Sequence, residues 1–360
     1  MTQHGFVLDL DRCTGCAACI LACANENSPS AAIAWRNITT FNQQRLPTAP
    51  VFHYSLACNH CKEPACLVGC PADAYTKDPA TGAVLIDRDR CMGCRYCLWV
   101  CPYEAPQFDG RSGIIEKCTF CNHRLAVDLE PACVVACPVD ALGLERMDEP
   151  AVVRRAGFPE TGLRPAARFV GERRLAPPEM TAVRTTATAQ PARRRRGWRT
   201  FTAEWSLWAF TSIITLLTAW FTAAAAAGRL VILPVFAIAG LAAIGLSALH
   251  LGRPGRAWRG VFNWRGSWIS REALAVTLFL GLGSVLTALP APPPAAIWVA
   301  AAVGCASLIA MDMVYRVPGQ SVQAVPHIAM TTLTAAYYVG LILAAPALAL
   351  PAGLLKVVLY

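Results

Sequence analysis

The sequence predicts an α+β, cysteine-rich head followed by an all-α, polytopic membrane domain. Three observations predict this division. Of the 17 cysteines in the 360 residues, 16 lie between positions 13 and 137 and one lies beyond them. Long apolar runs occupy residues 204–360, where charged side chains are scarce. Between the two regions, residues 151–200 hold 12 basic and only 3 acidic side chains.

Composition restricts the class of protein. Charged residues make up 15% of the chain, below the roughly 25% usual in soluble domains, and hydrophobic residues make up 55%. This composition excludes a disordered chain, and the length excludes a small disulfide-stabilised secreted protein. We expect two folded domains, at residues 1–150 and 204–360, joined by a basic linker rich in Arg, Ala and Pro at residues 151–203.

The cysteines of the head fall into four groups. The first and third groups follow C-x2-C-x2-C-x3-C, the second follows C-x2-C-x4-C-x3-C, and the fourth widens the middle gap to eleven residues. The groups are Cys13, Cys16, Cys19 and Cys23; Cys58, Cys61, Cys66 and Cys70; Cys91, Cys94, Cys97 and Cys101; and Cys118, Cys121, Cys133 and Cys137. Three close cysteines in a tight loop supply three corners of an iron–sulfur cube, and the fourth comes from elsewhere.

Zinc sites and disulfides are the competing interpretations of these cysteines. Zinc sites use pairs of C-x2-C, often with histidine, and do not need a triplet followed by Cys-Pro. Disulfides do not fit a head that we expect in the cytoplasm. The spacing therefore predicts four 4Fe–4S clusters in a ferredoxin-like head.

The head contains an internal repeat. The motif Asp-Arg-Cys-x-Gly-Cys occurs at residues 11–16 and again at 89–94, each time after a short strand-like run. Residues 63–74, which carry Glu-Pro-Ala-Cys and Cys-Pro-Ala-Asp-Ala, are repeated in similar form at 130–141. The order is A-B-A′-B′, which predicts two dicluster ferredoxin-like units.

The tail contains apolar runs of the length that crosses a bilayer, about 20 residues. They cover residues 205–227, 230–251, 273–289, 297–314 and 328–350. Buried helices of a soluble domain are the alternative, but residues 201–360 hold only 11 charged side chains. We therefore expect about five transmembrane helices.

Arginine positions predict the orientation. Residues 193–196 and 199 precede the first run, five arginines lie between the second and third, and residues 290–296 carry no charge. Positive-inside counting places the iron–sulfur domain on the cytoplasmic face of the inner membrane, in a multi-pass protein. Residues 1–11 contain no apolar signal region and no twin-arginine pair, and export alongside a partner that carries its own signal is the alternative. The Arg193–Arg196 run is better explained by topology and anionic lipid than by nucleic acid.

Ionisable residues at the edge of the tail are candidates for a quinone site. His250 ends the second run and Glu272 begins the third, with Arg256 between them. Ionisable residues in membrane segments are functional candidates, and histidine exchanges protons near neutral pH. The alternative is that His250 caps a helix and Glu272 pairs with Arg271 or Arg256. Haem is not expected, because cytochrome b anchors need paired histidines on facing helices and the tail has only His250 and His327.

The cysteine order and residues 101–106 (Cys-Pro-Tyr-Glu-Ala-Pro) resemble the four-cluster iron–sulfur subunit of the dimethyl sulfoxide reductase family over residues 5–145. Residues 250–254, 267–272 and 311–319 resemble the membrane anchor subunit of the same enzymes, which has eight spans. The resemblance implies that two subunits are fused here. It also implies four ligand sets: set 1 is Cys13, Cys16, Cys19 and Cys137; set 2 is Cys118, Cys121, Cys133 and Cys23; set 3 is Cys58, Cys61, Cys66 and Cys101; and set 4 is Cys91, Cys94, Cys97 and Cys70.

These observations predict an electron-transfer and membrane-anchor subunit. It passes electrons between the quinone pool, ubiquinone or menaquinone, and a partner that the resemblance implies to be a molybdopterin-type catalytic subunit; a cytoplasmic head favours a sulfite-oxidising complex. No residue of this chain is predicted to act on the partner's substrate. Two alternatives remain open: a subunit of a hydrogenase or formate-oxidising complex, and a non-catalytic membrane tether or redox scaffold.

Overall fold

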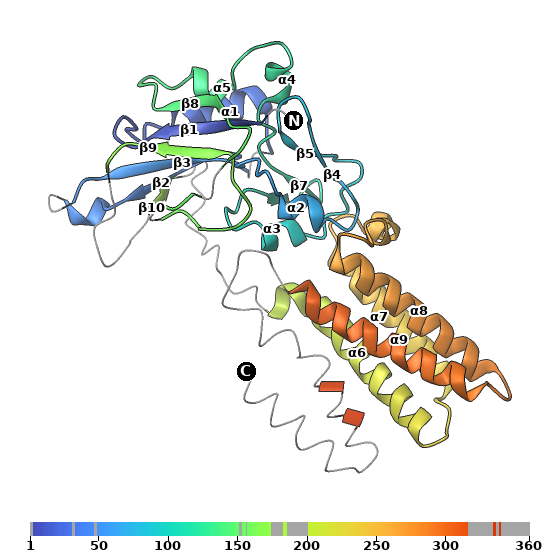
Figure 1. The fold of residues 1–360 in the computed structure, drawn as a ribbon. Coiled ribbons are helices and arrows are strands. Elements are labelled where there is room, and N and C mark those ends of the chain that lie inside the picture. Colours follow the sequence, from blue (N-terminus) through green and yellow to red (C-terminus); the bar gives the residue numbers. More distant parts are fainter. Residues whose placement is uncertain are drawn as a thin grey trace. The chain divides into compact units, whose positions relative to one another are not determined.

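The chain forms two compact units, Met1–Gly197 and Trp198–Tyr360. The computed structural model describes residues 3–30, 33–46, 49–150, 153–155, 157–173, 183–185, 201–315, 334–335 and 338–339. The first unit, here called the cysteine-rich unit, combines short strands and short helices, and the second, the helical unit, contains long helices (Figure 1). The predicted α+β head followed by a helical domain is confirmed.

Strand β1 (His4–Asp9) is the centre of the first sheet. It pairs antiparallel with β8 (Leu142–Arg146) and parallel with β9 (Ala167–Val170). Successive side chains of a strand point to opposite faces, so Phe6 and Leu8, two residues apart, lie on the same face. Both are buried, at 6% and 2% exposure. The strand-like run expected before the first cysteine group is thus a strand, His4–Asp9.

A second sheet has the order β10-β2-β3, with both pairs antiparallel. Strands β2 (Asn37–Phe41) and β3 (Phe52–Leu56) flank the short helix η1 (Gln43–Arg45), and β10 is Val183–Thr185. Residues of the expected linker therefore supply two strands, β9 and β10, to this unit. Each of these strands pairs with the edge of a strand from the first 60 residues, so a short extended segment is enough to extend the sheet.

The cysteine groups lie in loops around short elements. Two hairpins, β4 (Tyr75–Lys77) with β5 (Val84–Ile86) and β6 (Gln107–Asp109) with β7 (Ile114–Glu116), complete the strands. The α-helices that the structure describes in this unit are α1 (Ala18–Asn27), α2 (Ala65–Val68), α3 (Tyr96–Val100), α4 (Asn122–Leu125) and α5 (Ala132–Val135).

Strand pairing links the cysteine groups in a nested order. Strand β1 precedes the first group and its partner β8 follows the fourth. Strand β5 precedes the third group and its partner β4 follows the second. The pairing therefore brings the first group to the fourth and the second to the third.

In the part of the helical unit between residues 201 and 315, the structure describes four long helices. They are α6 (Phe201–Ala226), α7 (Leu233–Leu249), α8 (Trp268–Ala288) and α9 (Pro294–Val314), with the 3-10 helix η2 (Pro254–Val261) between α7 and α8. Helix α9 packs on α8 and α6, and α7 packs on α6 and α8. The rings of Phe221, Phe236 and Phe279 meet at centroid distances of 5.5–5.7 Å in its core.

Three of the described helices are long and apolar enough to cross a membrane, at Trp205–Ala226, Trp268–Ala288 and Pro294–Val314. The pair α7 and η2, bent by 106°, makes a fourth if it counts as one span. These segments correspond to four of the five expected spans, although α8 begins five residues before the expected position 273. The fifth expected span, residues 328–350, lies outside the described residues except for four positions.

Candidate functional site

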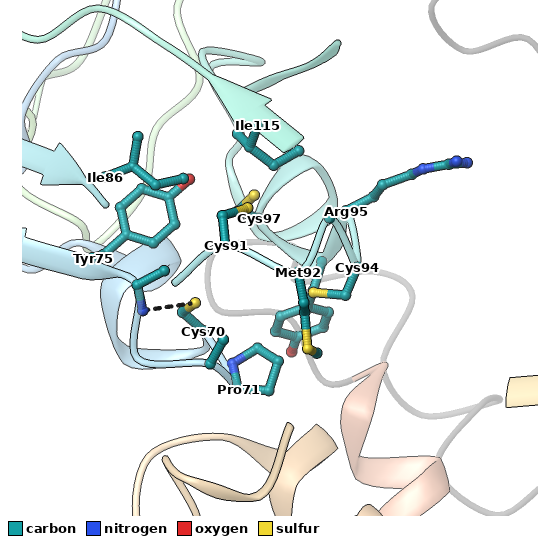
Figure 2. Close-up of a pocket in the computed structure, with 14 residues that line it drawn as sticks. Cys70, Pro71, Tyr75, Ile86, Cys91, Met92, Cys94, Arg95, Cys97 and Ile115 are labelled. Atoms are coloured by element: carbon teal, nitrogen blue, oxygen red, sulfur yellow. Dashed lines mark hydrogen bonds between the residues drawn. The ribbon is translucent and has the colours of Figure 1, made fainter. Parts of the chain in front are cut away.

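Four thiols line one cavity of the cysteine-rich unit. Cys91, Cys94 and Cys97 come from the segment between β5 and the first turn of α3, and Cys70 follows α2. Figure 2 shows these four side chains around the cavity, with the backbone N–H of Ala74 donating to Cys70 Sγ at 3.4 Å. Three thiols of one group and the last thiol of another thus converge, and together they are the members of set 4.

Two further cavities repeat this arrangement. The members of set 3 line one of them, and the members of set 1 line the other. In set 1 the backbone N–H of Ala141 donates to Cys137 Sγ at 3.2 Å, as Ala74 does to Cys70. Each cavity therefore combines three thiols of one group with the last thiol of the group that strand pairing places beside it.

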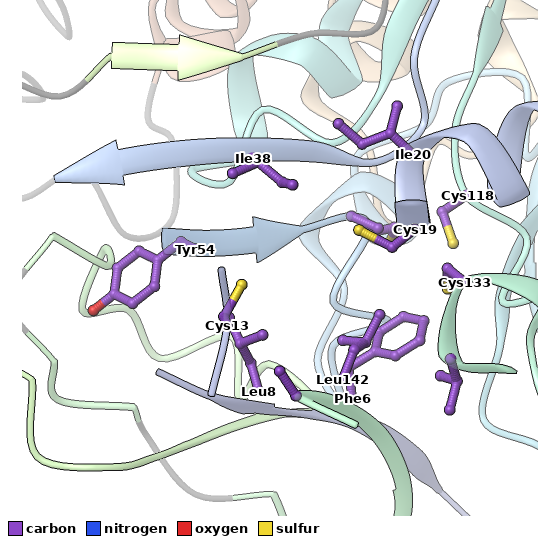
Figure 3. Packing of buried hydrophobic residues seen from close by; sticks show 14 of the residues in the cluster. Phe6, Leu8, Cys13, Cys19, Ile20, Ile38, Tyr54, Cys118, Cys133 and Leu142 are labelled. Atoms are coloured by element: carbon purple, nitrogen blue, oxygen red, sulfur yellow. The ribbon is translucent and has the colours of Figure 1, made fainter. Parts of the chain in front are cut away.

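The remaining thiols, those of set 2, share polar contacts. Asn27 Nδ2 lies 3.5 Å from Cys121 Sγ and 3.8 Å from Cys23 Sγ. Burial raises the pKa of Cys23 to about 12, and the neighbouring Cys133 and Cys121 add to this shift. Figure 3 shows Cys118 and Cys133 close to Cys19 of set 1, which also interacts with Cys133.

The repeated motif has the same backbone conformation in both copies. Gly15 and Gly93 have φ values of 72° and 71°, in the left-handed region that glycine adopts most readily. Asp9 Oδ1 accepts two backbone N–H groups of the first loop, and Asp87 Oδ1 accepts two of the second. The sequence repeat is therefore also a structural repeat.

Two surface ion pairs also follow the repeat. Arg12 pairs with Asp140 at 3.3 Å, and Arg90 pairs with Asp73 at 3.8 Å. Each pair joins the start of one cysteine group to the residues after the last cysteine of its partner group. Because the side chains are 40–85% exposed, these pairs contribute little to stability.

The donor chemistry fits iron–sulfur clusters. All sixteen grouped donors are thiols, the ligand type of 4Fe–4S clusters, and the four sets each hold four of them. Burial raises the pKa of Cys94 to about 12, so a bound metal would be needed to keep this ligand as a thiolate. Among the described residues, no group of three or more His, Cys, Asp or Glu side chains is arranged to hold a single metal ion.

Three cationic or imidazole side chains are buried beside the thiols, and of these Arg36 lies in no motif that the sequence analysis singled out. Arg36 and Lys117 are each 1% exposed and His60 is fully buried. Lys117 Nζ donates to the carbonyl oxygens of Cys118, at 2.9 Å, and Val84, and His60 Nδ1 accepts the N–H of Val84 at 2.9 Å. Nothing in the spacing of these residues distinguishes them from surface residues.

The expected quinone residues lie at one end of the helical unit. His250 is the C-cap of α7, Arg256 lies in η2, and Glu272 lies in the first two turns of α8. All three belong to the connection from α7 to α8 or to the helix ends that it joins. Arg271 donates to the carbonyl oxygens of Trp264, at 3.0 Å, and Arg265.

Two further polar residues occur at the same end of the helical unit. Asp312, near the end of α9, is 1% exposed, and Tyr315 interacts electrostatically with both Asp312 and Glu272. The sequence analysis did not select them as site residues, because one acidic residue within an apolar run gives no spacing signal. His327 lies outside the described residues.

Comparisons with known proteins agree with this architecture. Residues 50–147 match the 4Fe-4S dicluster domain, and residues 200–357 match the DMSO reductase anchor subunit (DmsC). A sulfite dehydrogenase subunit of Allochromatium vinosum is 34% identical over 218 residues, covering 51% of this chain and 90% of the relative. Anaerobic dimethyl sulfoxide reductase subunits are 39% identical over 158 residues in Haemophilus influenzae and 38% over 156 in Escherichia coli, covering 41% of this chain and 77% and 76% of the relatives.

The fold, the thiol-lined sites and the membrane helices define an iron–sulfur electron-transfer protein with its own membrane anchor. This protein belongs to the dimethyl sulfoxide reductase family and combines an iron–sulfur subunit and a DmsC-type anchor in one polypeptide. The predicted resemblance is therefore confirmed.

Proposed function

We propose that this chain carries electrons between a membrane quinone and a molybdopterin-type catalytic subunit, through four 4Fe–4S clusters held by sets 1 to 4. The main support for this proposal is that sixteen thiols form four sets of four and that three of these sets each line a cavity. Bound clusters would accept and pass on single electrons. The thiols would hold them, and the surrounding apolar side chains would exclude water from their sulfurs.

The catalytic partner is supported by homology. The relatives are named as subunits of a sulfite dehydrogenase and of anaerobic dimethyl sulfoxide reductases. We infer that the substrate of the complex binds to another polypeptide, which carries the molybdenum or tungsten pterin cofactor.

The quinone would bind at the end of the helical unit that holds His250, Arg256 and Glu272. Oxidation of a quinol releases two electrons and two protons, so groups at the membrane edge must accept the protons while one-electron carriers accept the electrons. The imidazole of His250 and the carboxylate of Glu272 are suited to accept protons. Arg256, with a permanent positive charge, would orient the quinone oxygen.

A purification experiment tests the partner and the clusters. The tagged protein is isolated anaerobically in mild detergent, copurifying chains are identified, and iron, molybdenum, tungsten and nickel are quantified. We expect about 16 iron atoms per chain and one molybdenum or tungsten per complex. Nickel in the complex would favour a hydrogenase, and a chain without any partner would favour a membrane tether.

A substitution tests the quinone site. We expect His250→Ala to abolish cluster reduction by a quinol analogue, because the proton acceptor is lost, while dithionite still reduces the clusters. The measurement is stopped-flow absorbance in isolated membranes. Arg229→Ala is the control, since Arg229 follows α6 at the opposite end of the helices. Wild-type quinol kinetics in the His250 variant would contradict this site.

The iron–sulfur domain is proposed to lie on the cytoplasmic face of the inner membrane. A cysteine introduced as Ala291→Cys, in the uncharged connection between α8 and α9, should react with a membrane-impermeant maleimide in intact cells. Gly255→Cys, in η2, should react only after the cells are permeabilised. The opposite pattern would place the domain outside.

A further inference from the structure

Arg36 is a buried guanidinium in the cysteine-rich unit. It immediately precedes β2 and is 1% exposed. Its Nη1 donates to both the carbonyl oxygen and the hydroxyl oxygen of Ser55, each at 3.1 Å. The guanidinium carbon also lies 4.5 Å from the centre of the Phe6 ring. These contacts hold the side chain in one place.

The neighbours of Arg36 are thiols from two different sets. Cys19 of set 1 and Cys23, Cys118 and Cys133 of set 2 all interact electrostatically with its guanidinium. Cys19 Sγ lies 3.2 Å from the Ser55 hydroxyl that Arg36 contacts. In Figure 3, Cys19, Cys118 and Cys133 lie close together. Arg36 therefore lies where sets 1 and 2 approach each other.

Two of its donor atoms lack an acceptor. Nε and Nη2 of Arg36 have no hydrogen-bond partner that meets the usual distance and angle in the described part of the chain, and the Cys133 thiol lies beside the guanidinium. A guanidinium stays charged in proteins, and a buried charge without a counter-charge is strongly unfavourable. The burial of Arg36 is accounted for if an anion lies among these thiols. A cluster with four thiolates is such an anion, and its sulfurs accept N–H donors.

We propose that Arg36 is a positioning residue that donates hydrogen bonds to the clusters of sets 1 and 2 and stabilises their reduced forms. This inference rests on the proposed ligand sets. When one electron enters a 4Fe–4S cluster, the cluster gains one negative charge, and no bond or proton changes at Arg36. A fixed positive charge nearby favours the added electron and therefore raises the reduction potential.

Lys117 provides a matched comparison within the same unit. It is equally buried, but it lines the cavity of set 3, and its Nζ donates to peptide oxygens of Val84 and Cys118. The same physical argument assigns Lys117 to the cluster of set 3. Removing either charge should thus affect different clusters.

The test is a redox titration of the anaerobic complex, followed by electron paramagnetic resonance. In Arg36→Gln, we expect two of the four cluster signals to shift to lower potential, with at least a tenfold lower reduced-to-oxidised ratio at a fixed ambient potential. For a one-electron couple this is about 59 mV. Arg36→Lys should restore part of the shift. Lys117→Gln should move the signal of a third cluster instead.

Each outcome decides the proposal. Unchanged potentials in Arg36→Gln at full iron content would overturn it. If that variant does not retain its iron, wild-type protein labelled with 15N-arginine is measured by pulsed resonance. A nitrogen coupling to a reduced cluster is then expected, and its absence overturns the proposal. If the wild-type protein contains too little iron for four clusters, fewer than about 16 atoms per chain, the proposed function is contradicted, independently of Arg36.

Discussion

At the scale of single residues, the cysteine loops depend on unusual backbone conformations. Gly15 and Gly93 adopt the left-handed region, and so do Ala17 and Arg95, at φ values of 65° and 64°. Non-glycine residues in this region are strained and persist only where the surroundings hold them. Ala17 and Arg95 each follow the second cysteine of their group, so the two loops adopt the left-handed conformation at matching positions.

Gly15→Ala is expected to destabilise the cysteine-rich unit by about 1–2 kcal/mol through the left-handed backbone, with a further steric cost. The added Cβ would lie 2.7 Å from Cε1 of His53. The measurements are the urea concentration at the midpoint of unfolding and the iron content of the anaerobically purified protein. Gly110→Ala is the control, because its Cβ would meet no atom within 4 Å. Equal losses in both variants would contradict the argument.

His53 makes stability depend on pH. Burial, together with the positive charge of Arg173, lowers the pKa of His53 below its ordinary value of 6.5. Near pH 6 the unfolded state therefore binds more protons than the folded state. The stabilisation that comes from keeping His53 neutral is complete above the pKa of the unfolded state, and it is lost as the pH falls through the pKa of the folded state. We expect the wild-type urea midpoint to fall more than that of His53→Gln between about pH 7.5 and about pH 5.5. Parallel pH profiles would exclude this effect.

At the scale of elements, close helix packing in the helical unit depends on glycine. Gly283 of α8 faces α7, and an added Cβ would lie 2.7 Å from Cε1 of Phe236. Gly304 of α9 similarly faces Phe279 of α8 at 2.9 Å. Small residues allow helices to approach closely in membranes, where apolar burial does not drive their association.

Gly283→Leu is expected to destabilise the helical unit by about 1–3 kcal/mol, because the side chain must displace the packed ring of Phe236. The measurement is the thermal aggregation midpoint in detergent. Gly281→Leu lies in the same helix, and its Cβ would meet no atom within 4 Å, so it provides the control. Similar midpoints for the two variants would show that this packing is unimportant.

At the scale of the whole molecule, two compact units with separate apolar cores share one polypeptide. One core includes Phe6, Leu8 and Tyr54, and the other includes Phe221, Phe236 and Phe279. Among the described residues the two cores have no member in common, so we expect each unit to fold from its own contacts. A fused chain also holds the two parts at a fixed ratio of one to one.

The cysteine-rich unit produced without residues 198–360 is therefore expected to bind iron as the full chain does, at about 16 atoms per chain. It should not be reduced by a quinol analogue, because the helical unit is missing. Iron analysis and quinol-driven reduction test this expectation, with the full chain as reference. An iron-free, aggregated product would mean that the unit depends on the anchor.

The sequence by itself determined the ligand chemistry and the length of the apolar helices. Thiol spacing and apolar run length are local properties, so the four cysteine groups and the extents of α6 and α9 could be predicted closely. The strands β9 and β10 could not, because they are stabilised by partners far away in the sequence. The burial of Arg36, Lys117 and Asp312 was decided only by the tertiary structure, since a single charged residue carries no pattern until distant segments enclose it.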